Sequence, residues 1–198
     1  MNSGNSWLKT LRMHARYWSL LSFLLPVALY AQEYDNLAEA LKEPHKVIHL
    51  DLHHERLKEF PAEIVLFRNL ETLDLSKNKI DSLPMLILNL PRLKKIDLSR
   101  NKFTHLPEIL SRLPNLTELK MARNPVEEIP GYIVQFKKLE TLDLWDSDLK
   151  TIHPDIIKLN SLKLLDVRAT YLKSKELEWL EIARPDLKVE STYGCNCD

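Results

Sequence analysis

Residues 70–92 have the sequence LETLDLSKNKIDSLPMLILNLPR, and residues 93–115 repeat its pattern as LKKIDLSRNKFTHLPEILSRLPN. Both segments place leucine or isoleucine, an asparagine and a Leu-Pro pair at the same offsets. The same pattern recurs every 23 residues on both sides of these two segments. Its first residues are Val47, Leu70, Leu93, Leu116, Leu139 and Leu162. These starts share the pattern LxxLxLxxNxLxxLPxxIxxLxx without an insertion, and a fixed period of this length predicts a solenoid of stacked repeats.

Each repeat opens with apolar residues that alternate with polar ones, such as Leu73 and Leu75 around Asp74. A period of two predicts a short strand with one buried face, and successive strands would stack in parallel about 4.8 Å apart. An asparagine follows the strand, where its amide can satisfy backbone groups that have left the ladder. It recurs as Asn78, Asn101 and Asn124. Prolines on the return side favour short helical or extended backbone there. They are Pro61, Pro84, Pro107 and Pro130.

The pattern predicts six repeats over residues 47–173, with the sixth incomplete, and a cap at each end to cover exposed apolar surface. Residues 32–46 hold a short helical pattern with Asp35 as its expected N-cap. Residues 174–190 begin with a second helical pattern and end in an extended piece. The expected core-facing residues of this second helix are Leu177, Leu180 and Ala183. Residues 191–198 form a tail.

The first 31 residues differ from the rest of the chain, because they contain basic residues and no acidic ones. An apolar run follows from Tyr17 to Ala31; it is shorter than the ~20 residues of a spanning helix and is interrupted by Pro26. This arrangement predicts a signal peptide, residues 1–31, cleaved before Gln32. We therefore expect a secreted or periplasmic protein whose mature chain does not span a membrane. An uncleaved helix that anchors the chain is the alternative.

Composition narrows the classes of function. The 28 basic and 28 acidic residues balance, so no global field favours nucleic acid or an anionic membrane. No serine lies in a G-x-S-x-G turn, and no glycine-rich loop could cradle a phosphate. The only cysteines, Cys195 and Cys197, are too few for a structural zinc site. We expect no cofactor, no enzymatic activity and a monomer.

These motifs resemble those of the leucine-rich-repeat family, in its 23-residue subclass, over residues 47–173. The A-E-A-L-K and V-I-H-L-D-L segments at 38–42 and 47–52 are similar to those of small secreted repeat proteins of the Bacteroidetes. The resemblance implies an α/β solenoid, a curved right-handed coil with parallel strands on its concave face and a short helical or extended return side. It also implies a binding role. Three repeats depart from the asparagine position, with Glu55, Ser147 and Thr170.

The alternation predicts which side chains line the concave face. The middle column is Asp51, Asp74, Asp97, Lys120, Asp143 and Asp166. Beside it lie His53, Ser76, Ser99, Ala122, Trp145 and Arg168, and then His54, Lys77, Arg100, Arg123, Asp146 and Ala169. From these columns we select a candidate partner-binding set of Trp145, Arg168, Arg123, Arg100, Lys77, Asp97, Lys120 and Asp143.

Three features of this face have competing interpretations. Trp145 is either a binding hot spot or a side chain that packs over its neighbours. Lys77, Arg100 and Arg123 form a basic column, which either recognises a charged partner or is neutralised by cross-strand pairs. His49, Asp51 and His53 carry metal-ligand chemistry. However, alternate residues on a strand lie ~7 Å apart, so we expect solvated histidines and no metal site.

The sequence therefore predicts a non-enzymatic module that binds a protein, or a glycan, on the concave face of a repeat solenoid. The alternative is a structural or adhesion component of the cell envelope, anchored by its amino-terminal helix or its tail cysteines. We expect no nucleic-acid partner.

Overall fold

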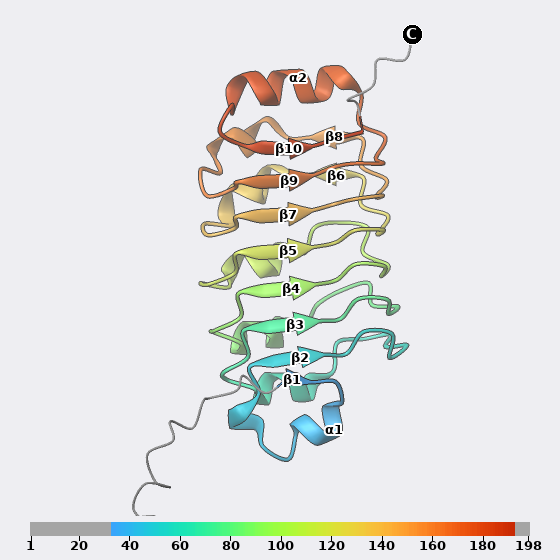
Figure 1. Cartoon of the computed structure of the whole chain (residues 1–198), viewed down its shortest axis with the longest axis vertical. Helices are drawn as coiled ribbons and strands as arrows, with labels where there is room; N and C mark the ends of the chain where they lie inside the picture. Colours follow the sequence, from blue (N-terminus) through green and yellow to red (C-terminus); the bar gives the residue numbers. More distant parts are fainter. Residues whose placement is uncertain (1–32, 193–198) are drawn as a thin grey trace, which may run out of the picture. The chain divides into compact units, whose positions relative to one another are not determined.

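The computed structural model describes residues 33–192, and Figure 1 shows their strands stacked one above another. Eight parallel strands form the main sheet, which confirms the predicted solenoid architecture. In spatial order they are β1 (Glu33–Tyr34), β2 (His49–Asp51), β3 (Thr72–Asp74), β4 (Lys95–Asp97), β5 (Glu118–Lys120), β7 (Thr141–Asp143), β9 (Leu164–Asp166) and β10 (Lys188–Glu190). From β2 to β9, each residue pairs with the one 23 positions further on, as Leu73 does with Ile96. The predicted signal peptide and the Cys195 and Cys197 tail lie outside the described residues.

The return side of each repeat is a single short turn of 3-10 helix. These helices are η3 (Ala62–Leu66), η4 (Met85–Asn89), η5 (Glu108–Arg112), η6 (Gly131–Gln135) and η7 (Pro154–Lys158). A proline is the residue before each of the first four, and in η7 Pro154 is itself the first residue. Because proline fixes φ and donates no hydrogen bond, it fits the start of a helical turn and not its interior. The sequence prediction of a short helical return side is confirmed.

The core lies between the sheet and these helical turns. The central residue of each strand from β3 to β9 is at most 1% exposed, and the return-side residue Ile87 is completely buried. Burying one such side chain contributes about 1.5–3 kcal/mol. One repeat cannot cover its own apolar face, so this burial depends on the repeats stacking.

Asn101 shows how the turn after each strand is held. Its amide donates to the carbonyls of Leu75 and Leu98, each at 2.9 Å, and its Oδ1 accepts from the backbone N–H of Ile80 at 3.0 Å. Asn78 and Asn124 make the equivalent bonds. The asparagines therefore satisfy backbone groups at the turn, as the sequence predicted. Each one bonds the repeat before it as well as its own, and we call this set the asparagine ladder.

The residue before each ladder position has a left-handed backbone. The φ values lie between 54° and 64°, at His54, Lys77, Arg100, Arg123, Asp146 and Ala169. The left-handed region is unfavourable for residues with a Cβ, by roughly 1–2 kcal/mol. At four of these turns the next residue is buried, namely Asn78, Asn101, Asn124 and Ser147. The basic column predicted from the sequence lies on these turns.

A second, two-stranded sheet was not expected from the sequence. Strands β6 (Glu128–Ile129) and β8 (Thr151–Ile152) pair in parallel, away from the main sheet. They lie where the asparagine ladder ends, since position 147 is a serine whose buried hydroxyl has no hydrogen-bond partner among residues 33–192. Backbone bonds from Lys150 to Glu127 (2.8 Å) and from His153 to Ile129 (2.9 Å) join the two repeats there instead.

At the amino-terminal end, helix α1 (Leu37–Ala40) has Asn36 as its N-cap, so the expectation of Asp35 was wrong. The Asn36 side chain accepts from the backbone N–H groups of Ala38 (2.8 Å) and Glu39 (3.2 Å). Strand β1 precedes this helix and adds to the sheet next to β2.

At the carboxyl-terminal end, helix α2 (Ser174–Ala183) buries Leu177 and Leu180, but Ala183 is exposed, contrary to expectation. Arg184 is buried in its place, with 6% of its surface exposed. Its guanidinium donates to the carbonyls of Leu159 and Leu162, both at 3.0 Å. Leu159 belongs to the fifth repeat and Leu162 opens the sixth, so Arg184 bonds both and closes the end of the coil.

Candidate binding face

The sheet face is the exposed side of the eight-stranded sheet, which the sequence assigned as the concave face. Residues on either side of each buried strand centre point outward from it, because side chains alternate along a strand. Pairing without a shift in register therefore sets equivalent residues of neighbouring repeats side by side in columns.

The aspartates of the middle column have a structural bond as well as a place on this face. Each accepts a hydrogen bond from the backbone N–H two residues later, as Asp97 does from Ser99 at 2.8 Å and Asp143 from Trp145 at 2.9 Å. Burial raises the pKa of Asp97, and the neighbouring Asp74 adds to this effect. Burial likewise raises the pKa of Asp143, with Asp166 and Asp97 adding to it. The ionised carboxylates of Asp97 and Asp143 are therefore held on this face at a cost in free energy, chiefly that of burial.

Lys120 interrupts the aspartate column and belongs to a charge network on β4 and β5. Glu118 pairs with Lys95 at 2.9 Å and with Lys120 at 3.2 Å. Burial alone would raise the pKa of Glu118, but the two lysines together outweigh it and leave that pKa below its usual value. A shallow hollow of about 200 Å³ lies beside this network, and Asp74 and Asp97 contribute to its lining.

A further column was missed when site residues were selected from the sequence. It precedes the aspartate column and consists of His49, Thr72, Lys95, Glu118, Thr141 and Leu164. The alternation that revealed the other columns also predicts that this one faces outward. One of its members, Glu118, pairs with Lys120, and a second, Lys95, pairs with the same glutamate. This column therefore belongs to the same surface.

Trp145 is half-buried and not freely exposed. The guanidinium carbon of Arg123 lies 4.3 Å from the centre of its ring, a cation–π contact. Arg123 also donates through Nε to Asp146 at 2.8 Å. On the neighbouring repeat, Arg168 is held by Asp166, to which its Nε donates at 3.0 Å. The carboxyl-terminal half of the sheet face therefore presents an aromatic ring between two fixed arginines.

The basic column divides into two kinds of residue. Arg123 has the partners just described, whereas Lys77 and Arg100 form no ion pair within residues 33–192. The charge of Arg123 is therefore neutralised by a residue of the neighbouring repeat, whereas within the described residues the charges of Lys77 and Arg100 are not. The structure brings Trp145, Arg123, Arg168 and Asp143 together, while Lys77 and Arg100 lie with Asp97 toward the amino-terminal repeats.

His49 on β2 and His53 just after this strand contact other groups. His53 Nδ1 lies 2.8 Å from Asp51, and His49 contacts the Thr72 hydroxyl. Within the part of the chain that the structure describes, no three histidine, cysteine, aspartate or glutamate side chains gather as a metal site requires. No helix among these residues has the length and apolar character needed to cross a bilayer.

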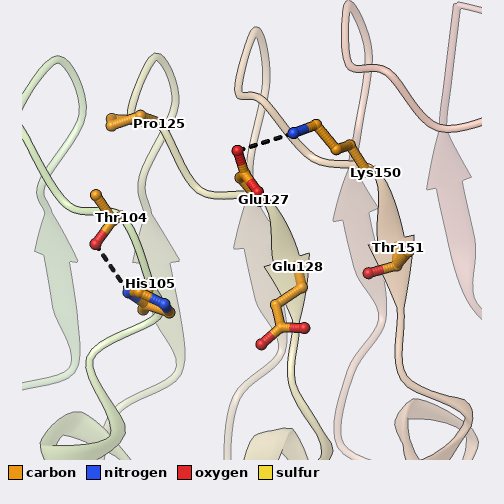
Figure 2. A pocket seen from close by; sticks show the side chains of 7 residues that line it. All are labelled: Thr104, His105, Pro125, Glu127, Glu128, Lys150 and Thr151. Carbon is orange, nitrogen blue, oxygen red and sulfur yellow. Dashed lines mark hydrogen bonds and ion pairs between the residues drawn. The ribbon is translucent and has the colours of Figure 1, made fainter.

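Figure 2 shows a larger hollow, of about 510 Å³, at the edge of the third to fifth repeats. Its lining residues are Thr104, His105, Pro125, Glu127, Glu128, Lys150 and Thr151. The hollow borders the strand pair β6–β8, and Glu127 and Lys150 close an ion pair of 2.8 Å across neighbouring repeats there. This hollow was not predicted from the sequence, because it depends on the second sheet.

The fold and the sheet face define a repeat solenoid with a structured, charged surface. Residues 68–126 match the family model described as Leucine rich repeat. No curated protein sequence matches the chain. The resemblance to leucine-rich-repeat proteins that we inferred from the sequence is confirmed, and the described residues have the leucine-rich-repeat fold.

Solved structures with this fold include a leucine-rich-repeat protein of Leptospira interrogans, 27% identical, with a TM-score of 0.64 over 77% of this chain and 45% of that one. Internalin C2 from Listeria monocytogenes is 23% identical, with a TM-score of 0.59 over 80% of this chain and 66% of that one. A plant peptide hormone receptor, RGFR1 in complex with RGF2, is 22% identical, with a TM-score of 0.56 over 80% of this chain and 27% of that one. This chain thus spans less than half of the Leptospira protein. Domains of this family generally act as protein-interaction modules.

Proposed function

We propose that this chain is a non-enzymatic module that binds a protein partner on its sheet face, centred on Trp145. The observation that carries the proposal is the stacking of Arg123 on Trp145, next to Asp143 and Arg168. Tryptophan and arginine are the residues most enriched at interface hot spots. Here both are fixed by neighbouring groups, so a partner would lose little side-chain entropy on ordering them.

The other candidate residues extend this surface toward the amino terminus. Lys120 and Asp97 lie side by side on neighbouring strands, and Lys77 and Arg100 stand on the adjoining turns. Their charges would set the orientation and association rate of a partner more than its affinity, because exposed charges contribute little binding free energy.

The proposal includes location. A signal peptide over residues 1–31 would deliver a chain beginning at Gln32 to the periplasm or the outside of the cell. Amino-terminal sequencing after membrane fractionation tests this: a soluble chain that begins at Gln32 supports it. A membrane-bound chain that retains its first residues would instead support the anchored structural or adhesion component.

Affinity capture from the native cell envelope tests the binding face. We expect Trp145→Ala and Arg168→Ala to weaken capture of a specific partner by about tenfold or more each, as hot-spot truncations do. The matched control is Lys137→Ala with Glu63→Ala, which changes exposed charged side chains on the return side. The sheet-face proposal fails if Trp145→Ala and Arg100→Glu both leave every captured partner unchanged.

A further inference from the structure

The turns of the first three repeats carry a dense set of cations. We call the following residues the basic edge: Arg56, Lys58, Lys77, Lys79, Arg100 and Lys102. All six side chains are exposed. They lie beside the sheet face, at the edge where the chain leaves the strands and turns toward the return side.

None of these six cations forms an ion pair or a side-chain hydrogen bond within residues 33–192. Elsewhere the same 23-residue spacing brings opposite charges together. Lys94 pairs with Glu71 at 2.8 Å, Lys150 with Glu127 at 2.8 Å, and Lys163 with Glu140 at 2.9 Å. The repeat geometry therefore allows ion pairs between neighbouring repeats. The cations of the basic edge form none of these pairs within the described residues.

The register instead places like charges on neighbouring turns, Lys77 next to Arg100 and Lys79 next to Lys102. Backbone bonds extend past the strands and tie these turns together, from Lys77 to Ser99 (2.8 Å) and from Lys102 to Ile80 (2.8 Å). Asn78 and Asn101 anchor the same turns from below. Like charges on neighbouring strands repel one another. Here the backbone bonds keep the turns that carry these charges next to one another.

A hollow of about 630 Å³ lies in the basic edge. Lysines from three successive turns, Lys58, Lys79 and Lys102, line it, and Phe60 and Pro84 contribute apolar surface. Glu59 and Asp81 are its acidic members, so cations outnumber carboxylates. The hollow can therefore take an anionic group with an apolar face.

The basic edge stops at the fourth repeat. Pro125 takes the place of Lys79 and Lys102, and the following turns carry the acidic residues Glu127, Glu128, Asp146 and Asp148. There Arg123 pairs with Asp146 and Lys150 with Glu127. Figure 2 shows this boundary, with Thr104 and His105 on one side and the Glu127–Lys150 pair on the other. The dense set of unpaired cations thus ends after the third repeat.

We infer that the basic edge binds a linear anionic polysaccharide bearing sulfate or carboxylate groups. Neighbouring rows of cations follow the spacing of stacked strands, about 4.8 Å, so a chain with regularly spaced anions can meet one row after another. Single-stranded nucleic acid is a poorer fit, because its binding sites stack bases on exposed aromatic side chains. Phe60, the aromatic side chain that lines the hollow, is buried. The inference does not rest on the sheet-face proposal.

Equilibrium binding of the full chain to fluorescein-labelled heparin, measured by anisotropy across a salt series, tests this inference. The variant Lys77→Asn, Lys79→Gln, Arg100→Asn, Lys102→Gln removes four charges, and asparagine tolerates the left-handed backbone at 77 and 100. We expect its binding to weaken by about tenfold or more and its salt dependence to flatten.

The matched control removes four exposed cations elsewhere: Arg92→Gln, Arg112→Gln, Lys173→Gln and Lys175→Gln. This control should keep wild-type heparin binding. Trp145→Ala should also keep it, because that variant tests only the sheet-face proposal. Thermal unfolding verifies that each variant is folded. Equal losses in the edge and control variants, or tighter binding of single-stranded DNA than of heparin, would overturn the inference.

Discussion

Arg123 and Trp145 occupy neighbouring repeats and adjacent columns, and the guanidinium of the first stacks 4.3 Å from the ring centre of the second. We expect a double-mutant cycle of Arg123→Ala and Trp145→Ala to give a coupling free energy of about 0.5–1 kcal/mol in urea unfolding. A parallel cycle of Arg123 with Asp146 measures their ion pair, and its coupling should fall at high salt. A coupling of zero between Arg123 and Trp145 would mean that the contact does not order the ring.

Replacing Asn101 with alanine should destabilise the protein by roughly 2–4 kcal/mol, since buried carbonyls and one N–H lose their partner. Chemical denaturation measures this change. Asn160→Ala is the control, because that side chain is exposed, and it should stay close to wild type. Equal effects at the two positions would remove the basis for the asparagine ladder.

Ser147→Asn should have the opposite effect. The serine hydroxyl is buried, at 3% residue exposure, and has no partner among the described residues 33–192; an asparagine there would extend the ladder by one repeat. We expect a gain of about 1 kcal/mol in the free energy of unfolding. Ser161→Asn, at a half-buried position outside the ladder, serves as the comparison. A destabilised Ser147→Asn protein would show that the β6–β8 pairing leaves no room for the amide.

Asp97→Asn should raise stability at neutral pH and lose that advantage in acid. The folded-state pKa of Asp97 is raised, chiefly by burial, so wild-type stability from this group is present below the ordinary value of 3.8 and is lost as pH rises through the folded value. Asparagine keeps an oxygen for the Ser99 N–H. Unfolding at pH 3 and pH 7 measures the difference.

Glu118→Gln is the natural contrast to Asp97→Asn. The pKa of Glu118 is lowered overall, because its lysine partners outweigh its burial, so its contribution is lost as pH falls. This variant should lose stability at pH 7 and match wild type in strong acid. The same pH dependence in both variants would contradict the assigned environments.

Arg184→Met should loosen the carboxyl-terminal cap, since the carbonyls of Leu159 and Leu162 lose a buried donor, at a cost of roughly 2–4 kcal/mol. Hydrogen exchange should show faster opening of helix α2 and strand β10 than of β3 and β4. Lys175→Met on the exposed side of α2 is the control. Uniform acceleration across all strands would instead indicate that the cap and the repeats unfold as one unit.

The parts of the fold that were predicted from sequence are those that depend on a pattern within one repeat. Alternating leucines predicted the strands, Asn78 and its equivalents the turns, and the prolines the short return helices. The parts that were missed depend on contacts between repeats or at the ends. The β6–β8 pair forms where Ser147 ends the ladder, and Arg184 reaches back over more than twenty residues.

The candidate site shows the same division. The alternation of side chains placed Trp145 and the charged columns on the sheet face, because direction is a property of the strand alone. It did not indicate that Arg123 covers Trp145 or that Lys95 and Lys120 share Glu118. Nor did it indicate that Lys77 and Arg100 form no ion pair within the part of the chain that the structure describes. Those facts depend on side-chain length and on the sign of the charge one repeat away.

The asparagine ladder has a direction, because each asparagine bonds the repeat before its own. This direction affects how such chains can change in evolution. Asn101 supports the repeat that precedes it, through Leu75 and Ile80. A unit inserted upstream of an asparagine-bearing repeat is therefore stabilised at its junction, whereas one inserted before the Ser147 repeat is not. Duplication and deletion of whole 23-residue units should be tolerated in the amino-terminal half and selected against toward the carboxyl terminus. The surface can thus acquire new rows mainly at one end, next to the cations of the first three turns.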